Sequence, residues 1–484
     1  MKSVVFRVKN ILKSVLFYCQ IILKSVILSI ENILKNVKLV EISSKKAKFM
    51  LYRKIQERID EYFSNGSNKV LVIDGARQIG KSYIIRYMGQ KHFRNYIELN
   101  LLEDSLNKRL FADIQNTEDF YLRLSMFAGN KMGDKKDTLV FLDEIQECPR
   151  LLTLLKFLKQ EDRFTYIASG SLLGIALSET SSIPMGSIET ERMYPLDFEE
   201  FLLANGFNEF AINGLKNRFL NKQGLDEAMH EKVMDLFKKY LLVGGLPDAV
   251  NTFVQEKNIV KIRKIQNDIH SFYAADASKY DDENKLKIRK IYDLIPSMME
   301  NKKKRLVANK IDSKNARLDK YEDEFEYLTN AGVALDVSAI TDVKFPLVQS
   351  TTKNLLKLYL NDVGILTGIL YGNNISAVMD DISSINLGAV YETVVASELK
   401  AHGKKLYYYD NRQKGEVDFL IDDYDSLSVI PIEVKSGRDF TIHSALNNLQ
   451  KTGNVQTGIV LSNSAEIKQK DNTLYLPVYF VMFL

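Results

Sequence analysis

One octapeptide constrains this chain more than any other feature of its sequence. Residues 75–82 read Gly-Ala-Arg-Gln-Ile-Gly-Lys-Ser, which fits the pattern G-x-x-x-x-G-K-[ST]. The aliphatic run 70–73 precedes the octapeptide and predicts a buried strand, and residues 83–88 continue as a predicted helix. A strand, a glycine loop and a helix in this order are the context in which the motif binds phosphate. The alternative, a chance match on an ordinary turn, is disfavoured.

The residue types of the octapeptide explain this chemistry. Glycines let backbone N–H groups converge on a phosphate, and the N-terminus of the following helix adds its positive end. Lys81 is expected to neutralise the β- and γ-phosphate oxygens, and Ser82 to supply a hydroxyl to Mg²⁺. The motif therefore predicts ATP and Mg²⁺ as ligands. The residues expected to hold the nucleotide are Gly75, Ala76, Arg77, Gln78, Ile79, Gly80, Lys81, Ser82 and Tyr83.

A second predicted strand ends in two adjacent acids. The apolar run 138–142 leads into Asp143 and Glu144, about 60 residues after Lys81. Asp143 is expected to hold the Mg²⁺ shell, and Glu144 to orient and polarise the attacking water, with Lys81 as the second catalytic residue. The alternative is a solvated turn that happens to carry two acids. With the glycine loop upstream, the pair predicts hydrolysis as well as binding.

A third predicted strand, 164–168, ends in Ser169. A small polar side chain at such a strand tip can sense the γ-phosphate, and the alternative is an ordinary Ser-Gly turn. Three arginines are candidates for an arginine finger, and the sequence does not choose among Arg150, Arg163 and Arg192.

These runs together resemble a family of AAA-type ATPases of bacteria and archaea, most of them without known function. The resemblance covers residue 50 to the C-terminus and implies an α/β fold: a P-loop NTPase (AAA-type) parallel sheet over 50–205 and a helical lid over 206–284. Many family members carry a basic residue where Ser187 stands, so an arginine role there is not carried over. The further matching segments are Phe141–Pro149, Ala168–Leu173, Met193–Phe201, Val243–Pro247, and Asp276 with Ser278, Lys279 and Tyr280.

The middle of the chain, 285–384, is predicted to contain helices followed by two strands, at 333–337 and 355–360. Helices followed by a hairpin resemble a winged-helix module. The basic run 302–305 is interpreted as a solvated turn in preference to a DNA contact.

The C-terminal stretch, 385–484, combines a predicted helix that carries Glu392 with two predicted strands. Asp418 lies on the first strand, and Glu433 and Lys435 share one face of the second because side chains alternate along a strand. This arrangement resembles the restriction-endonuclease-like PD-(D/E)XK fold, an α/β nuclease-like domain.

That resemblance implies a divalent metal held by Asp418 and Glu433, with Glu392 completing the site and Lys435 stabilising the charge that develops on phosphate. DNA would then be a partner. The alternatives are an ion-paired structural strand pair and a nuclease-like fold that does not cut.

The N-terminal segment, 1–49, carries a basic amphipathic repeat of 11 residues, with Leu-Lys-Ser-Val at 12–15 and 23–26. It holds ten basic and two acidic residues, a local charge of +8. The favoured interpretation is an extension that arose from tandem repetition before Met50. A membrane-surface helix and a partner-binding helix stay open, whereas a transmembrane helix and a signal peptide are disfavoured.

Composition bounds the remaining choices. The 484 residues suffice for about three domains, and 45% hydrophobic with 26% charged residues is typical of globular proteins. Cys19 and Cys148 cannot form a disulfide framework, which favours a reducing cytoplasm. We therefore expect a cytoplasmic ATP-binding, ATP-hydrolysing protein that acts on DNA. The alternative is a nucleotide-gated regulatory protein with an inactive nuclease-like domain, whose output is a protein partner or a second copy of the chain.

Overall fold

The computed structural model describes most of the chain from residue 50 onward. Among the described residues, no helix is long and apolar enough to cross a membrane. The predicted N-terminal repeat 1–49 and the resemblance at 278–280 lie outside the described residues. The described ranges are 50–102, 105–171, 186–276, 285–301, 304–312, 317–380, 382, 385–411, 413–437, 443–451, 455 and 457–484.

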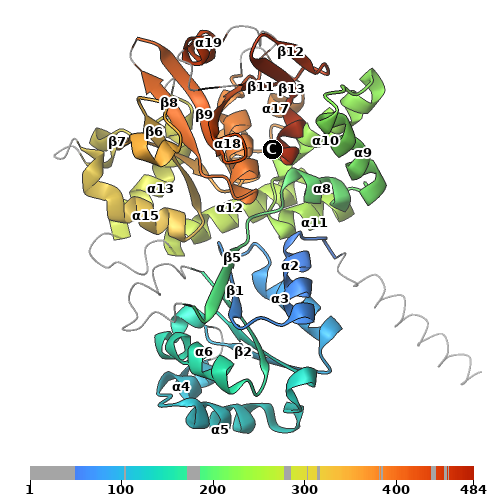
Figure 1. Ribbon diagram of the computed structural model, residues 1–484, viewed down its shortest axis with the longest axis vertical. Helices are drawn as coiled ribbons and strands as arrows, with labels where there is room; N and C mark the ends of the chain where they lie inside the picture. Colours follow the sequence, from blue (N-terminus) through green and yellow to red (C-terminus); the bar gives the residue numbers. More distant parts are fainter. Residues whose placement is uncertain are drawn as a thin grey trace, which may run out of the picture. The chain divides into compact units, whose positions relative to one another are not determined.

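The first sheet has five parallel strands in the order β2-β3-β4-β1-β5 (Figure 1). Parallel pairing requires a crossover between strands, and helices supply most of these crossovers. The strands predicted at 70–73, 138–142 and 164–168 are confirmed. The strand bounds are β1 (Val70–Asp74), β2 (Asn95–Asn100), β3 (Thr138–Asp143), β4 (Thr165–Gly170) and β5 (Ile188–Arg192).

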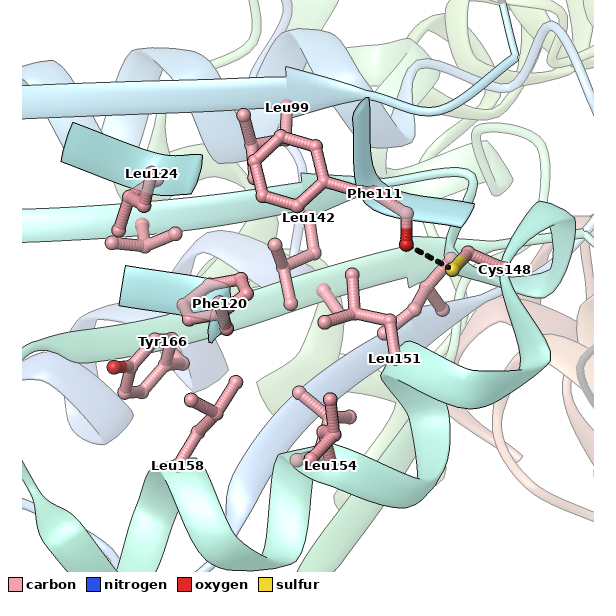
Figure 2. Close-up of a cluster of buried hydrophobic side chains, with 14 of the residues drawn as sticks. Leu99, Phe111, Phe120, Leu124, Leu142, Cys148, Leu151, Leu154, Leu158 and Tyr166 are labelled. Carbon is pink, nitrogen blue, oxygen red and sulfur yellow. Dashed lines mark hydrogen bonds between the residues drawn. The ribbon is translucent and has the colours of Figure 1, made fainter. Parts of the chain in front are cut away.

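Side-chain alternation divides each strand of this sheet between two faces. On one face, Leu142 and Tyr166 pack against Leu151, Leu154 and Leu158 of a single helix (Figure 2). The opposite face lies against α3 (Lys81–His92), which α2 (Ile55–Asn65) flanks. The helices of the first face are α4 (Ser105–Ala112), α5 (Thr117–Ala128) and α6 (Pro149–Glu161).

Short 3-10 helices connect several of these elements. In the first half of the chain they are η1 (Gly129–Lys131), η2 (Lys135–Asp137) and η3 (Ile145–Glu147). In the second half they are η4 (Leu318–Tyr321), η5 (Leu347–Ser350) and η6 (Val478–Phe483).

A run of helices follows the first sheet, as the sequence predicted. The side chains of Asp197, Asn208 and Asp226 cap the first three by accepting a backbone N–H, which satisfies donors that a helix start leaves free. The helices are α8 (Phe198–Ala204), α9 (Glu209–Leu220), α10 (Glu227–Val243), α11 (Pro247–Glu256) and α12 (Ile259–Asp276).

The second sheet has eight strands in the order β12-β13-β11-β10-β9-β8-β6-β7, and its later strands are drawn in orange and red (Figure 1). Their bounds are β6 (Ala334–Ile340), β7 (Thr351–Leu360), β8 (Tyr407–Asn411), β9 (Gly415–Asp423), β10 (Ser428–Val434), β11 (Gly458–Ser462), β12 (Lys468–Lys470) and β13 (Thr473–Pro477).

Helices surround this second sheet. The predicted helix over 387–399 is confirmed as α18. The helices are α13 (Lys285–Met299), α14 (Ala308–Ile311), α15 (Glu322–Asn330), α16 (Val363–Tyr371), α17 (Ser376–Met379), α18 (Gly388–Ala401) and α19 (Ser444–Gln450).

The hairpin predicted in the middle of the chain forms, but it belongs to the second sheet. β6 pairs antiparallel with β7 and, on its other side, parallel with β8, where Ser338 lies opposite Tyr407. One sheet thus crosses the predicted boundary at residue 384. The winged-helix-like module and the domain boundaries stay predictions, and residues Leu51–Leu484 form one compact unit.

Candidate nucleotide site and acid cluster

The predicted phosphate loop connects β1 to α3, and two of its glycines are required by its shape. Gly75 and Gly80 have φ angles of 143° and 94°, which side chains rarely adopt. A Cβ at Gly75 would lie 2.3 Å from the carbonyl oxygen of Met193. The loop therefore follows a path that the sequence Gly-x-x-x-x-Gly permits.

The Lys81 side chain lies inside this loop and is 5% exposed. Its Nζ donates hydrogen bonds of 2.8 Å to the carbonyl oxygens of Gly75 and Ala76. Burial lowers the pKa of Lys81, although the carboxylates of Glu144 and Asp74 oppose this shift. A buried ammonium of this kind fits an anionic ligand in the loop.

Asp143 ends β3 and gathers donors from three other elements. Its Oδ1 accepts from Ser82 Oγ at 2.9 Å and from Ser169 Oγ, and its Oδ2 accepts from Asn100 Nδ2 at 3.2 Å. Burial raises the pKa of Asp143, and the hydrogen bonds from the two serines oppose that shift. The structure therefore brings the predicted Ser82, Asp143 and Ser169 together, and it adds Asn100, which the sequence analysis missed.

Glu144 follows with a left-handed φ of 55°. Its Oε2 accepts from Gln146 Nε2 at 2.5 Å and from Ser171 Oγ at 3.2 Å. Gln146 and Ser171 were both missed. The sequence signal that could have found Ser171 is its place directly after the strand that carries Ser169.

Arg77 points away from the loop toward other elements. Its Nε donates to Ser171 Oγ at 3.2 Å, and its Nη1 donates to Asp276 Oδ1 at 2.7 Å. The Tyr273 hydroxyl donates to the Arg77 carbonyl oxygen at 2.7 Å. The last turn of α12 thus holds both the backbone and the side chain of this loop residue.

Arg53 fixes the opposite side of the loop. Its Nη1 donates to the carbonyl oxygen of Ile79 at 2.8 Å, its Nε to Glu200 Oε2 at 3.0 Å, and its Nη2 to the Tyr194 carbonyl oxygen at 2.6 Å. Tyr83, predicted to contact the nucleotide, lies in the first turn of α3 and is 39% exposed.

The three candidate arginine fingers have separate surroundings. Arg150 donates to Gln115, and Arg163 stacks over the ring of Tyr121. Arg192 Nη2 donates to the carbonyl oxygens of Thr329 and Asn330, the second at 3.2 Å. The role of a finger stays a prediction for all three.

Residues 67–202 match the family model of an AAA domain. The match contains the loop, Asp143, Glu144 and Ser169, so the AAA domain holds every residue predicted to bind or hydrolyse ATP. Two further families match, each a domain of unknown function: DUF8612 at 234–374 and DUF4143 at 387–481.

Two relatives come from the archaeon Methanocaldococcus jannaschii. The uncharacterized protein MJ1637 is 24% identical over 457 residues, which are 90% of this chain and 89% of that protein. The uncharacterized protein MJ1544 is 24% identical over 361 residues, 73% of this chain and 72% of that protein. The similarity therefore extends well beyond the AAA domain.

Among solved structures, a Walker-type ATPase of Pyrococcus abyssi, PABY2304, is 14% identical, with a TM-score of 0.40 over 66% of this chain and 96% of that one. Cdc6p of Pyrobaculum aerophilum is 9% identical, with a TM-score of 0.28 over 70% of this chain and 97% of that one. TM-scores this low give no basis for carrying over a function.

A second group of predicted residues meets outside the AAA domain. Glu392 lies on α18, Asp418 on β9, and Glu433 near the end of the neighbouring β10. Burial raises the pKa of Asp418, and the nearby carboxylates of Glu392 and Glu433 raise it further. The three side chains, which we call the acid cluster, therefore lie close enough to repel one another.

Lysines already bind the oxygens of these carboxylates. Lys304 Nζ donates to Glu392 Oε1, and Lys435 Nζ donates to Glu433 Oε1 at 2.7 Å. Lys357, which is 1% exposed, pairs with the neighbouring Glu416 at 2.6 Å. The interpretation of 302–305 as a solvated turn is wrong for its described residues, because Lys304 and Arg305 are both ion-paired and mostly buried.

The metal predicted at the acid cluster stays a prediction. Within the described ranges, no three His, Cys, Asp or Glu side chains gather as metal ligands. One oxygen does fit a cation: Glu433 Oε2 is buried and has no hydrogen-bond partner. The described geometry is therefore an ion-paired cluster with one unsatisfied carboxylate oxygen.

Proposed function

We propose that this chain binds ATP with Mg²⁺ in the AAA domain and hydrolyses it. The observation that carries the proposal is the carboxylate of Asp143, which receives the hydroxyls of both Ser82 and Ser169. It joins the phosphate loop to the tips of two strands, beside the acid Glu144. A hydroxyl and a carboxylate in contact are a donor set that suits Mg²⁺.

Each residue has a physical task in this proposal. The backbone N–H groups at the start of α3 bind phosphate oxygens. Lys81 gives up its hydrogen bonds to the carbonyl oxygens of Gly75 and Ala76 and binds the phosphate in their place. Glu144 orients the attacking water and accepts its proton. Ser82 and Asp143 would hold Mg²⁺, which would supply positive charge to the phosphates.

Two substitutions test the proposal. Lys81→Ala should abolish tight ATP binding. Glu144→Gln should keep ATP binding but lower kcat about 100-fold or more, because the carboxylate acts on water and not on the nucleotide. The measurements are equilibrium binding of a fluorescent ATP analogue and steady-state phosphate release. The exposed Lys91 on the same helix gives a matched control, Lys91→Ala, which should match the parent. Full turnover by Glu144→Gln would contradict the role given to Glu144.

A second candidate function is phosphodiester hydrolysis of DNA at the acid cluster. It is favoured by the unsatisfied Glu433 Oε2 beside two further carboxylates. The competing proposal is that Lys304, Lys357 and Lys435 neutralise the cluster permanently. The chain would then be a nucleotide-gated regulatory protein that acts on a partner.

Metal-dependent melting separates these two proposals. If the cluster binds a divalent ion, Mg²⁺ or Mn²⁺ should raise the melting temperature of the parent, because the ion binds the folded state. Asp418→Ala should remove that rise, and Lys435→Ala should keep it while abolishing any DNA cleavage. Lys81→Ala serves as the background throughout, so that metal bound with nucleotide does not contribute. No rise in this background would favour the regulatory protein.

A further inference from the structure

The carboxylate of Glu144 is held by two side chains to which the sequence analysis assigned no role. Gln146 Nε2 and Ser171 Oγ both donate to Glu144 Oε2, at 2.5 and 3.2 Å. Gln146 Nε2 also donates to Ser171 Oγ at 3.3 Å, which closes a triangle of three side chains. Gln146 is 8% exposed and Ser171 is 2% exposed. Buried hydrogen bonds of this kind restrict a side chain more than solvent-exposed ones.

We propose that Gln146 and Ser171 position Glu144 for ATP hydrolysis, and that Asp276, at the end of α12, controls this positioning through Arg77. The inference rests on the proposed ATPase activity and adds a means by which the helices after the AAA domain regulate it.

The geometry assigns a direction to each hydrogen bond. A serine hydroxyl has one proton, and Ser171 donates it to Glu144. Its oxygen then accepts from Arg77 Nε at 3.2 Å and from Gln146. A donor with positive charge polarises the hydroxyl and strengthens its bond to Glu144. Both donors act on Oε2, and among the residues that the structure describes no hydrogen bond to Oε1 is seen, so Oε1 is the oxygen that we assign to the water molecule.

Arg77 is in turn held by α12. Asp276 accepts from Arg77 Nη1 at 2.7 Å in an ion pair whose side chains are 9% and 13% exposed. Tyr273, which is 1% exposed, donates to the Arg77 carbonyl oxygen. Movement of the end of α12 would therefore move Arg77. The hydrogen bond from the Ser171 hydroxyl to Glu144 would then weaken.

The competing explanation is that the contacts between α12 and the phosphate loop only stabilise the fold. It predicts that removing the contacts lowers stability or nucleotide affinity and leaves kcat unchanged. Positioning predicts the opposite pattern, a lower kcat with unchanged affinity.

The experiment measures kcat, KM and the dissociation constant of a fluorescent ATP analogue on the full chain. Ser171→Ala and Gln146→Met should each lower kcat about 10- to 100-fold, the effect of losing one hydrogen bond to a charged group. Asp276→Asn should lower kcat about threefold, because it acts through a neighbour. All three should leave the dissociation constant within roughly twofold. Ser171→Thr, which keeps the hydroxyl, should recover most of the lost rate.

The matched control is Asp268→Asn, at an exposed position of the same helix, which should match the parent. A double-mutant cycle then tests the connection. Once Ser171 is alanine, adding Asp276→Asn should change kcat by less than about 1.5-fold, because both substitutions break one chain of contacts.

If Asp276→Asn lowers kcat by the same factor with and without Ser171, the proposal that Asp276 regulates the position of Glu144 is overturned. An unchanged kcat in Ser171→Ala and Gln146→Met, in a parent that hydrolyses ATP, would overturn the positioning while leaving the proposed function intact. A parent without turnover would overturn both.

Discussion

Gly245 lets the segment before α11 cross directly over Leu196. The Leu196 N–H donates to the Gly245 carbonyl oxygen at 2.7 Å, and the Gly245 N–H donates to Asp362 Oδ2 at 2.6 Å. A Cβ at Gly245 would lie 2.1 Å from the Leu196 carbonyl oxygen. Moving these two backbones apart would break the hydrogen bond between Leu196 and Gly245, and a shift of Gly245 would also break its bond to Asp362.

Gly245→Ala should therefore lower the free energy of unfolding by about 2–3 kcal/mol. The matched control is Gly214→Ala, in the exposed middle of α9, where a Cβ meets nothing within 4 Å. That substitution should raise stability by up to about 1 kcal/mol, because alanine favours the helix more than glycine does. Urea unfolding followed by circular dichroism measures both. Equal stability of the two variants would show that the loop shifts without cost.

At the scale of elements, α8 begins in a buried network of charges. Asp197 caps the helix by accepting the Glu200 N–H at 2.9 Å, and it pairs with Lys54 at 2.7 Å. Burial by itself raises the pKa of Asp197, but the ring of His402, whose Nε2 lies 3.7 Å from Oδ2, and the charge of Lys54 hold that pKa below its ordinary value of 3.8. The ionised carboxylate therefore stabilises the fold.

The sign of the pH dependence follows from this depressed pKa. The stabilisation is complete above the unfolded pKa of about 4 and is lost as the pH falls further, because the unfolded chain takes up the proton first. Asp197→Asn should cost about 2 kcal/mol at pH 7. The difference between parent and variant should shrink as the pH falls below about 4. Urea unfolding between pH 7 and pH 3 measures it, and a constant difference would contradict the role of the charge.

Elements with local patterns were predictable from the sequence, and elements defined by distant partners were not. The run 70–73, the motif that ends in Lys81 and the acids after 138–142 each combine periodicity with a neighbouring motif, so β1, β3 and α3 were predicted. The pairing of β6 with β8 has no local signature, because strand pairing depends on residues far apart in the chain.

The same distinction holds within the candidate site. Ser82, Asp143 and Ser169 follow from motif spacing, and the structure places them together. Asn100 and Gln146 had no role assigned from the sequence, and their place in the site became visible only through their contacts. Lys435 follows from its spacing to Glu433, whereas Lys304 and Lys357 come from segments far away in the sequence, so no spacing rule could indicate them.

Across the whole molecule, α18 connects two distant groups of residues. Its Glu392 lies in the acid cluster, and its Glu398 accepts the N–H of Phe198 at the start of α8, at 2.7 Å. Arg53 donates hydrogen bonds both to Glu200 of α8 and to the Ile79 carbonyl oxygen of the phosphate loop. A continuous set of contacts thus runs from the phosphate loop to α18.

ATP bound to Glu144→Gln should therefore slow amide hydrogen exchange in α8 and α18 as well as in the AAA domain. We expect about threefold slower exchange there, because ligand binding lowers the population of locally opened states. α19, which has none of these contacts, should exchange at the same rate with and without ATP. Protection restricted to β1, α3 and β3 would show that the contacts to α18 do not transmit the effect of ATP.

The second sheet, which crosses residue 384, determines where this protein can be cut into fragments that fold alone. Tyr407 and Tyr408 of β8 are 1% and 0% exposed, and β6 covers the edge of their strand. A fragment that starts after residue 384 would leave this aromatic strand at a bare edge, where it can pair with other chains. The portion that could be transplanted as a self-sufficient module therefore begins before Ala334, not at the boundary that the sequence pattern indicates.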